Sequence, residues 1–149
     1  MFDLVGASMT DDEAEAFLAD HGQGVLALAR GDEAYGVPVS YGYDEPEDRV
    51  VFQFLYERES KKREFVQSGG VVTLTVTDWS APGDWRSVIV TGELQRVPDA
   101  EVSDRLAAVF FGQSDNAAPA ARQSGRTSLA REWYQLPATD VTGRTAASE

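Results

Sequence analysis

The stretch VVTLTVTDW, residues 71–79, alternates apolar and polar side chains without interruption. The apolar positions share one face and the threonines share the other: Val72, Leu74, Val76 and Thr73, Thr75, Thr77. A period of two is typical of a strand that buries one face only, as strands of antiparallel sheets do. The stretch therefore predicts a half-buried antiparallel strand.

Strand-like segments continue on both sides of this stretch. They are GVLALAR (24–30), AYGVPVSYGY (34–43), RVVFQFLY (49–56), WRSVIVTGELQRV (85–97) and a last strand within AREWYQLPATDV (130–141). Pro38 has no amide to donate, which indicates an edge position or a bulge for the strand that contains it. Six strands joined mostly by short turns favour an antiparallel barrel over a parallel sheet.

Three helices are predicted between the strands. The first begins at Thr10, because Thr10 and Glu13 have the spacing of a capping box. The second is SKKREFVQSGG (60–70), a short helix that its two glycines end. The third begins at Pro98.

The chain shows no internal repeat and no linker, so residues 1–149 are expected to form one domain. Residues 1–9 and 144–149 are expected to be frayed, and 113–128 receive no assignment.

The composition excludes several kinds of site. The 149 residues contain no cysteine and one histidine, His21. Disulfides, thiolate metal sites, a cysteine nucleophile and multi-histidine metal clusters are therefore ruled out within one chain, and no metal is expected.

The charge is strongly negative, at −12. Such a chain repels nucleic acids and anionic membranes, so neither is expected as a partner. No signal peptide and no bilayer-length apolar run are visible, which favours a cytoplasmic protein. The excess of acids and the scarcity of lysine indicate a halophilic composition, because salt screens self-repulsion. An ordinary acidic cytoplasmic protein is the alternative.

The two lysines of the chain, Lys61 and Lys62, are adjacent and begin the second predicted helix. Cations at a helix N-terminus oppose the dipole unless an anion binds there, and a phosphate would use the amides and the ammonium groups together. Ser60 supplies a hydroxyl at the cap, and Arg58 or Arg63 would add a third cation. The alternative is a solvated helix face whose exposed ion pairs stabilise by only about 0–1 kcal/mol.

Nucleotide triphosphates and Rossmann dinucleotides have no support, because neither a Walker A loop nor GxGxxG occurs. Flavin mononucleotide and pyridoxal phosphate in a barrel both remain open at this point.

The order of these segments, with the ending WYQLPATDVTGR, resembles the pyridoxamine 5′-phosphate oxidase-like, FMN-binding split-barrel superfamily over roughly residues 10–145. Within it, the nitroimidazole-resistance-like flavoproteins are the most similar group. The resemblance implies a mainly β fold, a six-stranded antiparallel split β-barrel with Greek-key order and inserted helices. It also implies a homodimer with FMN at the subunit interface.

The resemblance also implies positions for the cofactor. The second and third predicted strands would contact the flavin ring and the ribityl chain. Lys61 would bind the phosphate, with a contribution from the residues on either side of it. A further contact would come from the fifth strand, beside Arg86. In order, these residues are Val37, Val39 and Ser40; Phe54, Leu55 and Tyr56; Ser60, Lys61 and Lys62; and Trp85 and Ser87.

The chain departs from the true oxidases at two places. The second strand, YGVPVSYG, lacks their arginine, and Arg131 and Arg144 do not reproduce their arginine-rich end. We therefore expect an FMN-dependent oxidoreductase or reductase acting on an unidentified small molecule, with no catalytic residue assigned. The alternatives are a non-catalytic protein that binds a flavin, a deazaflavin or a haem-type ligand, and a scaffold that has lost its cofactor.

Overall fold

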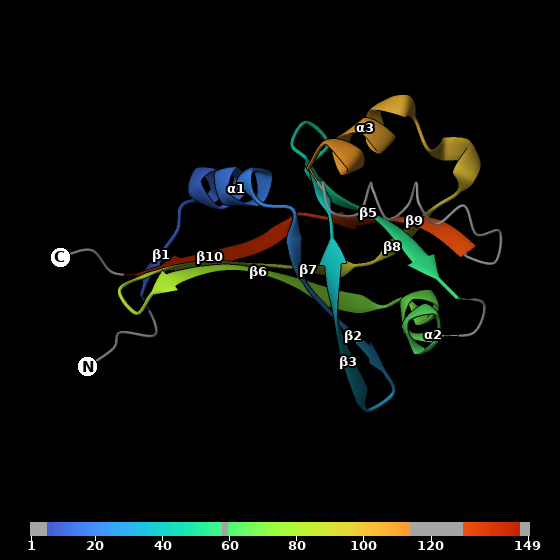
Figure 1. Ribbon diagram of the computed structural model, residues 1–149, viewed down its shortest axis with the longest axis horizontal. Coiled ribbons are helices and arrows are strands. Elements are labelled where there is room, and N and C mark those ends of the chain that lie inside the picture. Colours follow the sequence, from blue (N-terminus) through green and yellow to red (C-terminus); the bar gives the residue numbers. More distant parts are fainter. Residues whose placement is uncertain (1–5, 58–59, 114–129, 147–149) are drawn as a thin grey trace.

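The computed structural model describes residues 6–57, 60–113 and 130–146, which form two antiparallel sheets and three α-helices (Figure 1). The larger sheet has the order β1-β10-β7-β6-β2-β3, and the smaller sheet has the order β4-β5-β9-β8. The predicted mainly β split barrel with inserted helices is confirmed, and the two sheets remain open rather than closing into one cylinder.

The larger sheet contains β1 (Ala7–Ser8), β2 (Gln23–Arg30), β3 (Glu33–Ser40), β6 (Val71–Ala81), β7 (Asp84–Glu93) and β10 (Asp140–Thr145). The smaller sheet contains β4 (Gly42–Asp44), β5 (Arg49–Tyr56), β8 (Gln95–Val97) and β9 (Ala130–Pro137). The helices are α1 (Asp11–Asp20), α2 (Lys61–Ser68) and α3 (Asp104–Gln113), with a short 3₁₀ turn at Asp99–Glu101.

Three predicted strands are each divided in two, because the chain passes from one sheet to the other within them. Tyr41 separates β3 from β4, Leu94 separates β7 from β8, and Ala138 lies between β9 and β10. All three residues are buried. Because the residue at each crossing is apolar and buried, no turn-forming residue marks the crossing. The sequence pattern therefore predicts one continuous strand at each of these places.

The helix caps follow the sequence at two of the three helices. Thr10 forms the predicted capping box with Glu13 at α1, and the Ser60 hydroxyl accepts a hydrogen bond of 3.1 Å from the Arg63 amide at α2. The predicted start of the third helix at Pro98 is wrong. Val102 is extended, so only a 3₁₀ turn follows the proline, and α3 begins after Ser103, whose hydroxyl caps the Leu106 amide.

The chain ends are more ordered than expected. Ala7 pairs with Thr145 and Ser8 pairs with Arg144, so β1 adds a strand beside β10. The expectation of fraying is therefore wrong for these residues, since each end supplies the partner for the other. Residues 1–5 and 147–149 lie outside the described part.

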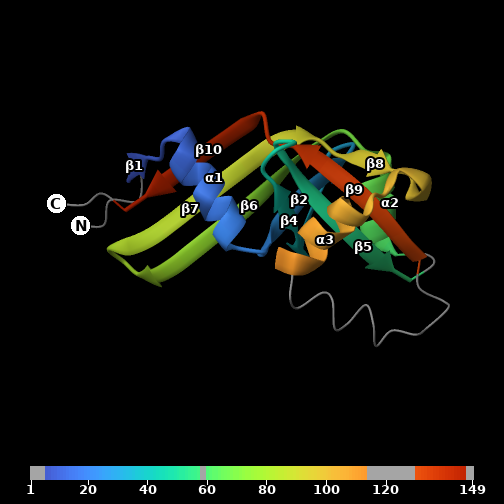
Figure 2. The same cartoon turned by 90° about the horizontal axis from the view of Figure 1, so that it is seen from above.

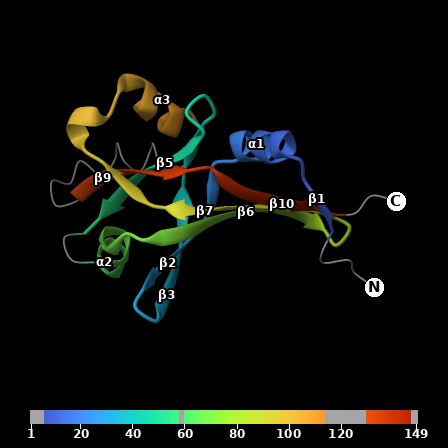
Figure 3. The same ribbon diagram turned by 180° about the vertical axis from the view of Figure 1, so that it is seen from behind.

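The main core contains buried residues of both sheets together with Phe17 and Leu18 of α1. Figure 2 shows α1 lying over the larger sheet and α3 lying over the smaller sheet. Helix α3 covers the far side of the smaller sheet, where Phe110 packs edge-on against Trp133. Figure 3 shows α1 over β10 and β7, so one face of the larger sheet is covered.

The opposite side of the larger sheet, which we call the outer face, carries no helix in the described part (Figure 1). Every large hydrophobic residue that is exposed in the described chain lies on this face: Val25, Val71, Trp79 and Ile89. The alternation predicted for β6 is confirmed, because Val72, Leu74 and Val76 are buried while the threonines between them point to this side.

Candidate functional site

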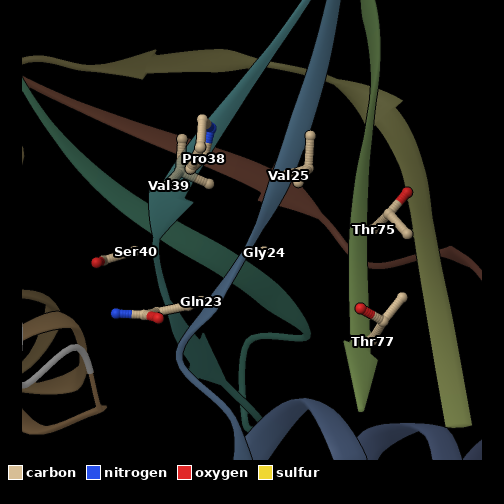
Figure 4. Close-up of a pocket in the computed structure, with 8 residues that line it drawn as sticks. All are labelled: Gln23, Gly24, Val25, Pro38, Val39, Ser40, Thr75 and Thr77. Atoms are coloured by element: carbon tan, nitrogen blue, oxygen red, sulfur yellow. The ribbon is translucent and has the colours of Figure 1, made fainter. Parts of the chain in front are cut away.

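Two adjoining pockets lie along β3. The first, the strand pocket, has a volume of about 380 Å³ and lies on the outer face (Figure 4). It is lined by Gln23, Gly24, Val25, Pro38, Val39, Ser40, Thr75 and Thr77. The second, the lysine pocket, has a volume of about 220 Å³ and is lined by Pro38, Val39, Ser40, Gln53, Phe54, Leu55 and Lys62. The pockets share Pro38–Ser40 and therefore adjoin along β3; together we call them the depression.

Three neighbouring strands, β3, β2 and β6, form the strand pocket, and their pairing register decides which residues line it. Pro38 lies opposite Val25, which in turn lies opposite Thr75. A Cβ at Gly24 would lie 2.6 Å from the Thr75 carbonyl oxygen, so glycine allows β2 to approach β6 closely. Strand β3 is the last strand of its sheet, as Pro38 predicted. The edge position leaves the pocket open on one side.

Lys62 supplies the charge in this depression. Its ammonium nitrogen lies 5.3 Å from the centre of the Phe54 ring and 5.7 Å from the centre of the Tyr56 ring. No carboxylate within the described ranges lies at ion-pair distance from it. Burial lowers the pKa of Lys62 below its ordinary value. A desolvated ammonium group of this kind is suited to receive an anion.

Lys61 points elsewhere. Its ammonium nitrogen lies 2.9 Å from the Glu33 carboxylate, over the rings of Tyr35 and Phe65. The hydrogen bond and the charge of Glu33 raise the pKa of Lys61, and its side chain is more than half exposed. The sequence assigned the phosphate contact to Lys61, whereas it is Lys62 that lines the lysine pocket.

A buried carboxylate anchors α2 beneath the pocket. Glu132 of β9 is 5% exposed and accepts hydrogen bonds of 3.1 Å from both Gln67 and Arg96. Arg63 of α2 lies 3.7 Å from the same carboxylate. Burial, with Glu132 nearby, raises the pKa of the Tyr56 hydroxyl. These contacts tie α2 to the smaller sheet and thereby orient Lys62.

The sequence-predicted site residues divide into two groups. Five line the depression: Val39, Ser40, Phe54, Leu55 and Lys62. The others lie around it.

Of these, Val37 packs against the core, Tyr56 is buried under Lys62, and the Ser60 hydroxyl is occupied as a helix cap. Ser87 lies opposite Thr77, and Trp85 lies opposite Trp79 at the end of the same face. Arg58 lies outside the described residues.

Sequence reasoning missed several lining residues. They are Gln23, Gly24, Val25, Pro38, Gln53, Thr75 and Thr77. A signal existed for the threonines, since their alternation with buried residues placed them on an open face. None existed for Gln23 and Gln53, whose places depend on strand register.

The single histidine lies outside the depression. The His21 ring stacks on Phe17, and its Nδ1 lies 2.8 Å from the Phe17 carbonyl oxygen. Its Nε2 lies 3.4 Å from Asp78, beside Arg86 on the α1 side of the larger sheet. The described residues contain no group of three or more potential metal ligands. They also contain no helix long and apolar enough to cross a membrane.

Two open antiparallel sheets around one core, with a lysine-bearing helix against an edge strand, define the split-barrel class of fold. The family model for pyridoxamine 5′-phosphate oxidase matches residues 10–145, and the chain belongs to this family.

Solved structures of the same fold include a FAD-binding protein of Mesorhizobium loti, with a TM-score of 0.72 and 20% identity over 96% of this chain and 97% of that one. A FAD-binding protein of Mycobacterium smegmatis has a TM-score of 0.62 and 18% identity, covering 94% and 98% of the two chains. A FAD- and haem-binding protein of the same organism has a TM-score of 0.65 and 15% identity, covering 92% and 71%.

Among curated proteins, an uncharacterised protein of Rhizobium meliloti is 27% identical over 90 residues, which is 60% of this chain. The match spans 56% of the length of that relative.

Proposed function

We propose that the chain is an FMN-binding flavoprotein and that Lys62 binds the cofactor phosphate. The observation that carries this proposal is the half-buried ammonium group of Lys62, which lines the lysine pocket without a carboxylate partner in the described chain. A phosphate would supply the missing counter-charge. Lys61 already has the Glu33 carboxylate as its counter-charge and does not need a phosphate.

The neighbouring strand pocket suits the flavin ring. Its lining combines the apolar side chains of Val25, Pro38 and Val39 with polar groups on Gln23 and Ser40. Apolar walls with a few polar groups are typical of cofactor sites. Because the two pockets share Pro38–Ser40, one ligand is able to extend from the ring site to Lys62.

We further propose that the chain is an oxidoreductase or reductase of a small molecule. A bound flavin supplies the redox chemistry, and the protein binds it, orients it and limits the access of water. In this chain Lys62 binds the anion, Gln23 and Ser40 orient the ring by hydrogen bonds, and the apolar walls exclude water. No lining residue is assigned as a general acid or base.

A second candidate is a binding protein without turnover. It is favoured by structural neighbours whose names state only that they bind FAD, or FAD and haem. FAD and a deazaflavin fit the same phosphate contact at Lys62. Haem has less support, because His21 lies on the opposite side of the sheet.

We also propose that the chain is a homodimer formed through the outer face. Val25 and Ile89 are 46% and 39% exposed and both lie beside Thr75 on this face. Exposed apolar groups gathered on one face mark an interaction surface. A second copy would cover them and close the open side of the strand pocket.

The test is to identify the chromophore of the purified protein. We expect a yellow protein with absorbance near roughly 450 nm, release of FMN detected by mass spectrometry, and sedimentation as two chains. Released FAD or deazaflavin would overturn the choice of FMN alone. A colourless protein that does not take up added FMN would overturn the proposal, and NAD(P)H oxidation with an added acceptor separates an enzyme from a binding protein.

A further inference from the structure

Lys62 is the less exposed of the two lysines, and its surroundings favour a neutral amine. Its nitrogen lies over the rings of Phe54 and Tyr56, and no carboxylate within residues 6–57, 60–113 and 130–146 lies at ion-pair distance from it. Ring faces attract an ammonium group more weakly than a carboxylate does, and they also displace water from it. Burial accordingly lowers the pKa of Lys62. A larger share of this amine is therefore unprotonated than at an ordinary surface lysine.

Lys61 provides the contrast within the same helical turn. Its nitrogen lies 2.9 Å from the Glu33 carboxylate, and its side chain is 55% exposed. An ion pair keeps a lysine protonated, and a protonated amine has no lone pair with which to attack an electrophile. We therefore expect the more exposed lysine to be the less reactive one, which is the reverse of the order that access from solvent alone would give.

The lysine pocket has a lining that suits a short acyl group. Four of its seven lining residues are apolar, and they would contact the alkyl part of the group. Ser40 and Gln53 also line the pocket, and both carry side-chain hydrogen-bond donors. Donors of this kind promote attack on a carbonyl carbon, because negative charge develops on the carbonyl oxygen. The pocket thus combines an amine, apolar walls and hydrogen-bond donors.

We propose that Lys62 is a site of acylation by small acyl phosphates in the cofactor-free protein, and that the acyl group blocks cofactor binding. An acyl phosphate suits a pocket of about 220 Å³ that is itself proposed to bind a phosphate. The neutral amine attacks the carbonyl carbon and forms a C–N bond. The C–O bond to phosphate breaks, phosphate leaves with the electron pair, and the amine proton passes to solvent. Nothing is oxidised or reduced.

The product at Lys62 is a neutral amide, so the charge that would bind the FMN phosphate is lost. Bound FMN in turn keeps Lys62 charged and covered, so cofactor and acyl group exclude each other. The exclusion rests on the proposed function, to which it adds a regulation of the same site: chains that lack FMN are open to a modification that prevents later loading.

Acetylation rates of the full cofactor-free chain with acetyl phosphate at pH 8 test the site. The chain contains two lysines, so Lys61→Arg leaves Lys62 as the one lysine, and Lys62→Arg is the matched control. Peptide mass spectrometry should show Lys62 acetylated at least about fivefold faster than Lys61, because one unit of pKa is a tenfold change in the neutral fraction. FMN at about ten times its Kd should slow the reaction at Lys62 by about tenfold and leave Lys61 unchanged. Chain acetylated at Lys62 should bind FMN at least about tenfold more weakly, as Lys62→Gln should.

Equal acetylation rates at the two lysines, or a faster rate at Lys61, would overturn the proposal. An FMN affinity that acetylation of Lys62 leaves unchanged would overturn the block on cofactor binding. Selective acetylation of Lys62 in a chain that takes up no flavin would keep the acylation site and reject the proposed function. FMN binding that is weakened in Lys62→Gln, together with equal acetylation rates at the two lysines, would do the reverse.

Discussion

At the scale of single residues, two adjacent lysines have opposite surroundings. Successive residues of a helix point about 100° apart, so Lys61 meets Glu33 while Lys62 lies over Phe54 and Tyr56. The sequence placed both at a helix N-terminus and the Ser60 cap confirms this. The sequence contained no information on which of the two lysines faces the pocket, because that depends on contacts such as Lys61–Glu33, between residues 28 positions apart in the chain.

Replacement of Lys62 by methionine should weaken FMN binding by about 10- to 150-fold, which corresponds to a loss of about 1.5–3 kcal/mol for a charge-assisted contact. Methionine retains an apolar stem over the two rings, so the fold should be unaffected. Fluorescence titration with FMN measures the affinity. Lys61→Met is the matched control and should change it by less than about twofold, since an exposed ion pair stabilises little. A larger loss in Lys61→Met than in Lys62→Met would assign the phosphate to the other lysine.

At the scale of elements, sequence periodicity identified every long strand but not the places where three of them change sheets. Tyr41 shows why. It is apolar enough to be buried between the sheets, and its hydroxyl finds a partner in the Leu18 carbonyl oxygen at 2.8 Å. Neither feature interrupts a β pattern, so no local signal marks the crossing. The same holds for the strand pocket, whose lining from β2 and β3 depends on register between strands.

Helix α3 is held to the smaller sheet by an ion pair with a buried carboxylate, which a substitution or a low pH would remove. Asp44 has a fully buried side chain and accepts hydrogen bonds from Arg49, at 2.9 Å, and from Arg105 of α3. Although burial acts to raise it, the hydrogen bonds from Arg105 and Arg49 hold the pKa of Asp44 below its ordinary value. The carboxylate therefore stabilises the fold while it is ionised.

Asp44→Ala should lower the free energy of unfolding by about 3 kcal/mol at pH 7, near the lower limit for a broken buried pair because Arg105 is half exposed and is hydrated when released. The pKa of Asp44 is lowered on folding, so its contribution is complete above about pH 5 and is lost as the pH falls through the folded value. Urea unfolding of both proteins at several pH values measures this. A difference that stays constant from pH 7 to pH 2 would contradict it.

At the scale of the whole molecule, the negative charge is not evenly balanced by ion pairs. Around the start of α1, burial and the carboxylates of Asp48, Asp12, Glu45 and Asp11 raise the pKa of Glu15. Like charges crowded in this way destabilise the compact state, and salt screens them. The halophilic character stays a prediction from the sequence, and this crowded group of carboxylates gives it a local test.

If this repulsion matters for stability, the melting temperature should rise between dilute buffer and 1 M KCl. A relief of about 1–2 kcal/mol corresponds to a rise of about 2–8 °C for a chain of this size. Differential scanning calorimetry measures the shift. Glu15→Gln removes one charge from the crowded group, so the variant should melt higher in dilute buffer and gain less from KCl. A melting temperature that does not respond to salt would identify an ordinary acidic protein. The added salt shortens the Debye length from about 10 Å to about 3 Å, so an unchanged melting temperature would mean that charge repulsion does not limit the stability.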